Sequence, residues 1–122
     1  MAKADGSYAY CTLRADKPLR DFLPEAARAH EACKRNGTIQ EDADSLSHLF
    51  LSSLPWMRYT ALVQPVPCPA DSNPRITWGR RFEENGRTRI PMSLLCHHAL
   101  ADGLHIARFY EALDAELERL GA

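Results

Sequence analysis

The 122-residue sequence has no apolar run that would cross a bilayer, no N-terminal stretch resembling a secretory signal, and no internal repeat. It also has no excess of charge, because 15 basic residues face 16 acidic ones and leave a net charge of −1. These absences disfavour a membrane protein, a secreted protein and a mainly electrostatic nucleic-acid binder, although a local basic patch stays open. We therefore expect a cytoplasmic protein with no membrane partner and no nucleic-acid partner.

The four cysteines contain no CxxC pair, so the spacing of a zinc ribbon is absent and no metal is expected from them. An even number would permit two disulfides, but a reducing cytoplasm favours free thiols. Cys11 and Cys96 lie within apolar stretches and are predicted to behave as small core residues.

The length and an apolar content of 45% are those of one globular domain, residues 1–122, with a real core. Residues 7–13 are rich in β-favouring side chains and predict a strand. A helix is expected from about Pro18, capped by Asp16 and ended by Asn36–Gly37. Residues 38–47 are polar and predict a loop.

Residues 49–63 predict extended structure broken near Pro55, and the proline-rich residues 64–74 predict a loop. Asn85–Gly86 lies between two strand-like segments and suits a type I′ hairpin turn. The last element is a helix over residues 103–120, and this mixture predicts an α/β fold, an α+β two-layer sandwich. The apolar stripe of that helix comprises Ile106, Phe109, Leu113, Leu117 and Leu120.

Two adjacent histidines, His97 and His98, leave an apolar strand, and Asp102 follows just before the last helix. Histidine is the side chain whose ordinary pKa lies nearest neutrality, so one held on a short turn suits a general base. Plainer interpretations stay open: His97 as a core histidine, and Asp102 as a helix cap. His98, Asp102 and His105 as metal ligands are a weaker alternative.

Three short stretches resemble motifs of one enzyme family. Residues 97–103, HHALADG, look like the HHxxxDG signature of chloramphenicol acetyltransferases, of which dihydrolipoyl acyltransferases and peptide-synthetase condensation domains carry related forms. Residues 52–56, SSLPW, resemble the family's serine-x-x-Pro-Trp segment, and residues 76–80, ITWGR, resemble the threonine-x-Gly-basic strand after it. Their order and separation agree with the chloramphenicol acetyltransferase family from about Tyr8 to the C-terminus.

The resemblance implies a mixed sheet with a packed C-terminal helix, and transfer of acetyl from acetyl-CoA to a hydroxyl of a small acceptor. His98 matches the catalytic base, and Ser52 matches the serine that stabilises the tetrahedral intermediate. Thr77 matches a threonine that assists there through water, and Asp102 matches an aspartate that supports the site's geometry.

Two further residues match positions near the family's ligands, and each has a plainer interpretation. Trp56 matches a tryptophan near the active site, but core packing is the more usual role of such a residue. Arg80 matches a basic residue near a CoA phosphate, whereas Arg80 and Arg81 also suit a solvated strand edge. Ser52 alone, without the family pattern, would be an ordinary strand serine.

The resemblance covers only about the C-terminal half of a chloramphenicol acetyltransferase. The absent half supplies strands, much of the acceptor pocket and the arginine that pairs with the aspartate matched by Asp102. We expect Asp102 to be more exposed, to find another arginine such as Arg58 or Arg108, or to act only as a helix cap. Because lost strands leave an edge and an apolar face uncovered, we also expect a homo-oligomer, a trimer by resemblance.

Two functions from different classes follow. The first is an acetyl-CoA-dependent O-acetyltransferase, completed by oligomerisation. The second is an inactive truncated remnant or an oligomeric interaction module of the same fold. A third, an acyltransferase with another acyl donor, as in dihydrolipoyl acyltransferases, is disfavoured by the Pro-Trp segment.

Overall fold

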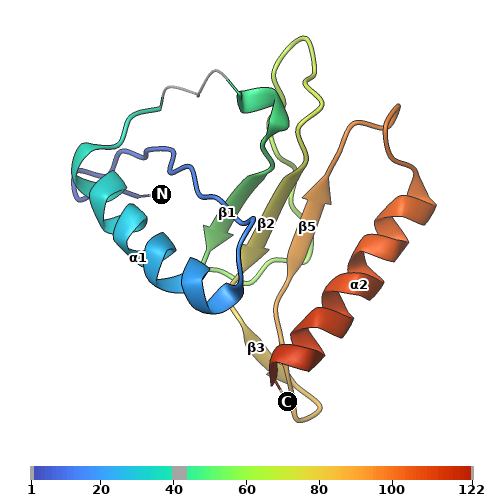
Figure 1. Cartoon of the computed structure of the whole chain (residues 1–122). Coiled ribbons are helices and arrows are strands. Elements are labelled where there is room, and N and C mark those ends of the chain that lie inside the picture. The colour runs from blue at the N-terminus through green and yellow to red at the C-terminus, as the bar shows by residue number, and fades with distance from the viewer. Residues whose placement is uncertain (1, 40–43, 122) are drawn as a thin grey trace. The chain divides into compact units, whose positions relative to one another are not determined.

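The computed structural model describes residues 2–39 and 44–121. The chain forms two compact units, Met1–Ser45 and Leu46–Ala122, each considered by itself below (Figure 1). The single domain expected from the sequence stays a prediction. No helix in the described part of the chain is long and apolar enough to cross a membrane.

The first unit contains helix α1, Leu19–Asn36. Gly37 ends this helix, as expected, and its N–H donates to the carbonyl of Cys33 at 2.8 Å. A Cβ atom on Gly37 would lie only 2.7 Å from the Cβ of Ala9, which is fully buried. Glycine is therefore needed here so that the segment around Ala9 can pack against the end of α1.

Two expectations for the first unit are wrong. Residues 7–13, all of which the structure describes, form no strand. Tyr8 makes an isolated bridge to Ala2, and the N–H of Tyr10 donates to Thr38 at 2.9 Å, so the segment lies beside a loop. Asp16 does not cap α1, because its carboxylate pairs with Arg14 at 2.9 Å.

The loop expected over residues 38–47 is described only in part, since residues 40–43 lie outside the described residues. Within it a short 3-10 helix, η1, covers Ser45–Ser47. The first unit also brings two thiols together. Burial raises the pKa of Cys11 to about 11, and a hydrogen bond with Cys33 acts in the same direction, so this thiol is no nucleophile near neutral pH.

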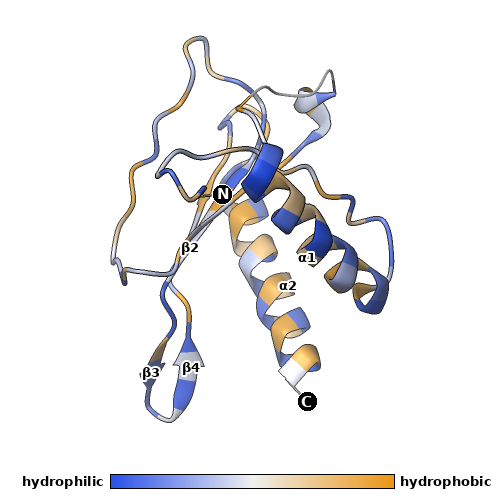
Figure 2. Ribbon diagram, turned by 90° about the vertical axis from the view of Figure 1, so that its left-hand side faces the viewer, coloured by the Kyte–Doolittle hydropathy of each residue, from blue (hydrophilic) through white to orange (hydrophobic). Residues whose placement is uncertain are grey.

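A three-stranded mixed sheet lies in the second unit (Figure 1). Strand β1, Phe50–Leu54, pairs in parallel with β2, Arg75–Gly79, and β2 pairs antiparallel with β5, Met92–Leu95. Strands β3, Phe82–Glu84, and β4, Arg87–Arg89, form a separate two-stranded ribbon that extends away from the sheet (Figure 2). The chain thus has the expected mixed α/β architecture.

The hairpin predicted at Asn85–Gly86 is confirmed. Both residues have positive φ, 52° and 72°, as a type I′ turn requires. The hairpin does not continue into the three-stranded sheet, because Pro91 lies between β4 and β5. The carbonyl of Pro91 accepts the N–H of Gly79 at 2.9 Å, which holds the base of the ribbon to the sheet.

Helix α2, Gly103–Gly121, follows the sheet and confirms the predicted C-terminal helix. Apolar residues line one side of it (Figure 2). The last part of the stripe is exposed, since Leu117 is 50% and Leu120 is 61% exposed, whereas Ile106, Phe109 and Leu113 are half-buried. The Oη of Tyr110 donates to the carbonyl of Met92 at 3.4 Å and joins α2 to β5.

Very little of the chain is buried. Among the described residues the buried apolar side chains are Ala9 and Ala26, both small. Cys11 and Cys96, expected in a core, are only half-buried. The sheet and α2 also carry exposed apolar side chains, since Leu51 of β1 and Leu117 and Leu120 of α2 are each at least 50% exposed.

Candidate active site

A row of hydroxyl side chains crosses the three-stranded sheet. Ser52 of β1 is the register partner of Thr77 in β2, and Thr77 is the partner of Ser93 in β5. Cross-strand partners point to the same face of a sheet, so the three hydroxyls share one face. Thr77, in the middle, is only 4% exposed. Ser93 was not expected from the sequence, where its one signal is a serine among apolar strand residues.

The register also separates Ser52 from its neighbour Ser53. Ser53 is opposite Trp78, which in turn is opposite Met92, and this row lies on the other face of the sheet. The two adjacent serines therefore face different surroundings. Only Ser52 shares a face with Thr77.

The segment after β1 is held against β2 by one backbone bond and one side-chain bond. The N–H of Arg80 donates to the carbonyl of Met57 at 2.7 Å, and the Oη of Tyr59 donates to the carbonyl of Thr77 at 2.7 Å. A Cβ atom on Gly79 would lie 2.7 Å from the Met57 carbonyl oxygen, so the close approach requires glycine. These contacts place Arg80 beside the segment that carries Trp56.

Trp56 and Arg80 are both on the surface of this chain. Trp56 is 69% exposed, so it does not fill a core in the described residues. Arg80 is exposed as well. Arg58, one of the arginines suggested as a partner for Asp102, instead lies 3.6 Å above the ring of Phe82 in a cation–π contact.

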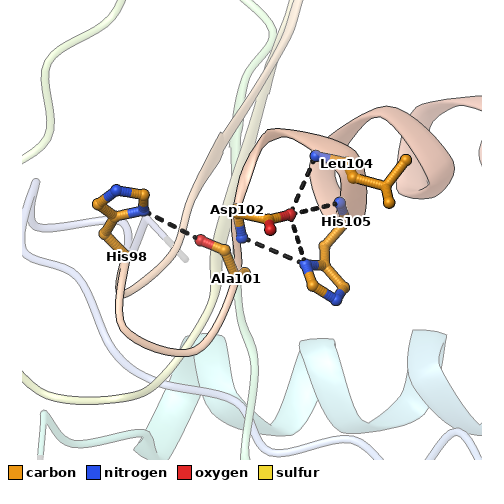
Figure 3. A network of polar contacts seen from close by, with 5 residues as sticks. All are labelled: His98, Ala101, Asp102, Leu104 and His105. Carbon is orange, nitrogen blue, oxygen red and sulfur yellow. Dashed lines mark hydrogen bonds and ion pairs between the residues drawn. The ribbon is translucent and has the colours of Figure 1, made fainter.

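His98 stands on the turn between β5 and α2. The N–H groups of Leu100 and Ala101 donate to the carbonyl of His97, at 2.9 and 3.2 Å, and define the turn. The Nδ1 of His98 lies 3.4 Å from the carbonyl oxygen of Ala101 (Figure 3). A carbonyl oxygen only accepts, so this contact is a hydrogen bond in the tautomer that carries its proton on Nδ1 and keeps the lone pair on Nε2. The ring is exposed.

His97 has the backbone partner expected of it but not the burial. Its Nδ1 accepts the N–H of Ala99 at 3.2 Å, and the side chain is exposed. The interpretation of His97 as a core histidine is therefore wrong for this chain. Both histidines are exposed on the short turn that follows β5.

Asp102 caps helix α2, which was one of the three alternatives expected for it from the sequence. Its Oδ1 accepts the N–H of Leu104 at 3.1 Å and that of His105 at 3.3 Å, and lies 2.7 Å from Nδ1 of His105 (Figure 3). The bond from the His105 N–H, followed by that from its ring, lowers the pKa of Asp102. Among the described residues no three His, Cys, Asp or Glu side chains lie close enough together to hold a metal ion, so the structure does not bring His98, Asp102 and His105 together as ligands.

A pocket of about 320 Å³ lies beside the histidine turn. Its polar wall is a two-pronged ion pair, in which Arg75 Nη1 and Nη2 lie 2.7 and 2.5 Å from the Asp71 carboxylate. This bonding lowers the pKa of Asp71, with a smaller contribution from His97. Nothing in the sequence pointed to this pair, because residues 71–75 lie in the proline-rich loop. The lining comprises Val66, Ala70, Asp71, Asn73, Arg75, Leu95, Cys96, His97 and His98.

Known proteins resemble this chain in part of its sequence and in its fold. The family model of chloramphenicol acetyltransferase matches residues 7–114. Chloramphenicol acetyltransferase 3 of Escherichia coli is 37% identical over 68 residues, which cover 55% of this chain and 32% of that protein. The chloramphenicol acetyltransferase of Vibrio anguillarum is 45% identical over 47 residues, covering 38% of this chain and 22% of the relative.

A solved chloramphenicol acetyltransferase structure superposes with a TM-score of 0.77 at 20% identity, covering 89% of this chain and 54% of that one. The fold prediction is confirmed by this likeness. The chain spans about half the length of the solved chain and about a third of the Escherichia coli relative. Because the family model covers most of its residues, the chain belongs to the chloramphenicol acetyltransferase family.

Proposed function

We propose that the chain is an acetyl-CoA-dependent O-acetyltransferase in which His98 is the general base. The observation that carries the proposal is the contact of His98 Nδ1 with the Ala101 carbonyl, which favours the tautomer with a lone pair on Nε2 of this exposed ring. The relatives support acyl transfer, since they are named chloramphenicol acetyltransferases. Chloramphenicol is therefore the first acceptor to test, with antibiotic resistance as the associated role.

The proposed reaction needs one proton acceptor that later returns its proton. Nε2 of His98 takes the proton of the acceptor hydroxyl while the oxygen forms a bond to the acetyl carbonyl carbon. The carbon–sulfur bond then breaks, and Nε2 returns the proton to the departing CoA sulfur. The products are an acetyl ester and free CoA, and His98 ends in its starting form.

The hydroxyl row supplies the other half of the proposed chemistry. Ser52 donates to the oxygen that becomes negative during transfer, and Thr77 assists from its buried neighbouring position. Asp102 acts through the helix cap, which holds the turn that carries His98. Arg80 and Trp56 are assigned to the acetyl-CoA side, because both are exposed next to the end of β1.

A homo-oligomer, a trimer by resemblance, completes the proposed site. The chain spans about half of the solved relative, and Leu51 of the sheet and Leu117 and Leu120 of the α2 stripe are exposed. A second copy would bury this apolar surface and exclude water from the base. The proposal keeps the cytoplasmic location expected from the sequence, and acetyl-CoA and a small hydroxyl-bearing acceptor as the partners.

Acetyl-CoA binding measured by calorimetry, with sedimentation of the same sample, tests this proposal. We expect binding by an oligomer and acetylation of at least one acceptor in a screen that begins with chloramphenicol. A chain that stays monomeric at every concentration would contradict the proposal that an oligomer completes the site. No binding at millimolar acetyl-CoA would contradict the enzyme and favour a non-catalytic interaction module.

A further inference from the structure

One peptide unit lies between two histidine rings (Figure 3). The carbonyl of Ala101 faces Nδ1 of His98 at 3.4 Å, and the N–H of Asp102 faces Nδ1 of His105 at 3.3 Å. Both groups belong to the planar peptide that joins Ala101 to Asp102. A rotation of that plane would break both contacts together. The contact of His98 with the Ala101 carbonyl therefore depends on how His105 contacts Asp102.

His105 has a second contact with the same residue. Its Nδ1 also lies 2.7 Å from Oδ1 of Asp102. A ring that carries its proton on Nδ1 donates to this carboxylate, and a ring with a lone pair on Nδ1 accepts the Asp102 N–H. Either tautomer of His105 therefore keeps one hydrogen bond to Asp102.

The arrangement is a capping box with an unusual third residue. Asp102 is the N-cap of α2 and His105 is the third helical residue, the position that glutamate or glutamine takes in this motif. The side chain there normally reaches back to the N-cap residue, and the His105 ring does so in either tautomer: it donates to the Asp102 carboxylate at 2.7 Å or accepts the Asp102 N–H at 3.3 Å. His105 thus holds the peptide unit on which His98 rests.

We propose that His105 is a positioning residue for His98, acting through the Ala101–Asp102 peptide unit. The inference rests on the proposed function, because it concerns the imidazole assigned there as the base. When the peptide is held, its carbonyl stays in place for Nδ1–H of His98, and the proton-free nitrogen is Nε2. When it is released, His98 populates both tautomers and part of the chain carries the proton on the wrong nitrogen.

The tautomer of His98 is measurable by long-range ¹H–¹⁵N correlation NMR of the imidazole, with or without substrate. In the wild type we expect the form protonated on Nδ1 to dominate. In His105→Ala the form protonated on Nε2 should gain about fivefold in relative population, the change that one helix cap corresponds to. His105→Gln should restore the wild-type ratio, since glutamine reaches back to the N-cap in the same way.

Glu111→Gln, an exposed change on the same helix, is the matched control and should leave the ratio unchanged. His105→Leu repeats the test if the alanine variant does not fold; the His105 side chain is 60% exposed, so both are expected to fold. An unchanged His98 tautomer ratio in a folded variant that lacks the His105 ring would overturn the inference.

Acetyl transfer gives a second readout that separates the two proposals. We expect His105→Ala to lower kcat by about fivefold with little change in KM, and His105→Gln to recover it. A wild-type chain without transfer activity would contradict the proposed function, whereas the NMR ratio would still decide the role of His105. A loss of kcat that His105→Gln does not recover would contradict the positioning role.

Discussion

The two sides of the candidate site are held by different kinds of structure. Ser52 and Thr77 are aligned by a backbone ladder across the sheet, and Thr77 is buried at its centre. His98 stands on an exposed turn that is held by local backbone bonds and by the cap of α2. The side proposed to meet the oxyanion is thus set by the sheet, whereas the proposed base depends on local geometry and is exposed to water.

The largest expected effect concerns the exposed side. His98→Gln removes the proton acceptor while keeping a polar side chain at an exposed position, so kcat should fall by about 10²- to 10⁴-fold. The urea midpoint should stay at the wild-type value. His30→Gln, on the exposed surface of α1, is the control and should keep full activity. A His98 variant that loses activity only because it unfolds would remove the contrast between the two sides.

Next in size is the hydroxyl row. Ser52→Ala should lower kcat by about 10- to 1000-fold, because it removes the hydroxyl that we propose as the donor to the developing oxyanion. Ser53→Ala is a matched control one residue away on the opposite face, opposite Trp78, and should retain activity. Steady-state kinetics of the two variants decide the point. Equal losses in both would show that the sheet register does not select the serine.

A packing change in the sheet tests its rigidity directly. Gly79→Ala places a Cβ atom 2.7 Å from the Met57 carbonyl oxygen and 2.9 Å from Cγ of Pro91. We expect a loss of about 1–3 kcal/mol in the free energy of unfolding, measured by urea denaturation. Gly121→Ala, where a Cβ meets nothing within 4 Å, should leave that free energy unchanged. A tolerated Gly79→Ala would mean that the turn after β1 is not held tightly.

The smallest effect is a loss of stability in acid. Hydrogen bonds from Arg75 lower the pKa of Asp71 below its ordinary value of 3.8, so the unfolded chain binds this proton more readily. The stabilisation is fully present above the unfolded pKa and is lost as the pH falls through the folded one. Urea midpoints measured between about pH 5 and pH 3 should decline less in Asp71→Asn. An identical decline would place the acid sensitivity elsewhere.

Local signals predicted the elements that depend on local chemistry. The Asn85–Gly86 turn follows from backbone preferences, and the periodic stripe predicted α2. The end of α1 at Gly37 was also predicted, although here glycine is needed for the close approach of Ala9 and not for its backbone angles. The segment over residues 7–13 misled, because β-favouring side chains form a strand only where a partner ladder exists.

The candidate site was likewise predicted only in part. The resemblance indicated His98, Ser52, Thr77 and Asp102, but not the contacts that hold Ser52 and Thr77 in one row and His98 and Asp102 on one turn. Ser93 joins the row only through strand register, and the Ala101 carbonyl that faces His98 carries no side-chain signal at all. The exposure of His97 and Trp56 was also unpredictable, because it depends on layers that the described residues do not contain.

The most direct test of the account is the formation of acetylated product. The chain, at a concentration where sedimentation shows an oligomer, is incubated with ¹³C-acetyl-CoA and chloramphenicol, and the product is identified by mass spectrometry. A thiol-release assay would be confused by the exposed Cys68, which mass spectrometry avoids. The account predicts a labelled O-acetyl ester with the wild type and almost none with His98→Gln. Equal product from both proteins would contradict the assignment of His98 as the base.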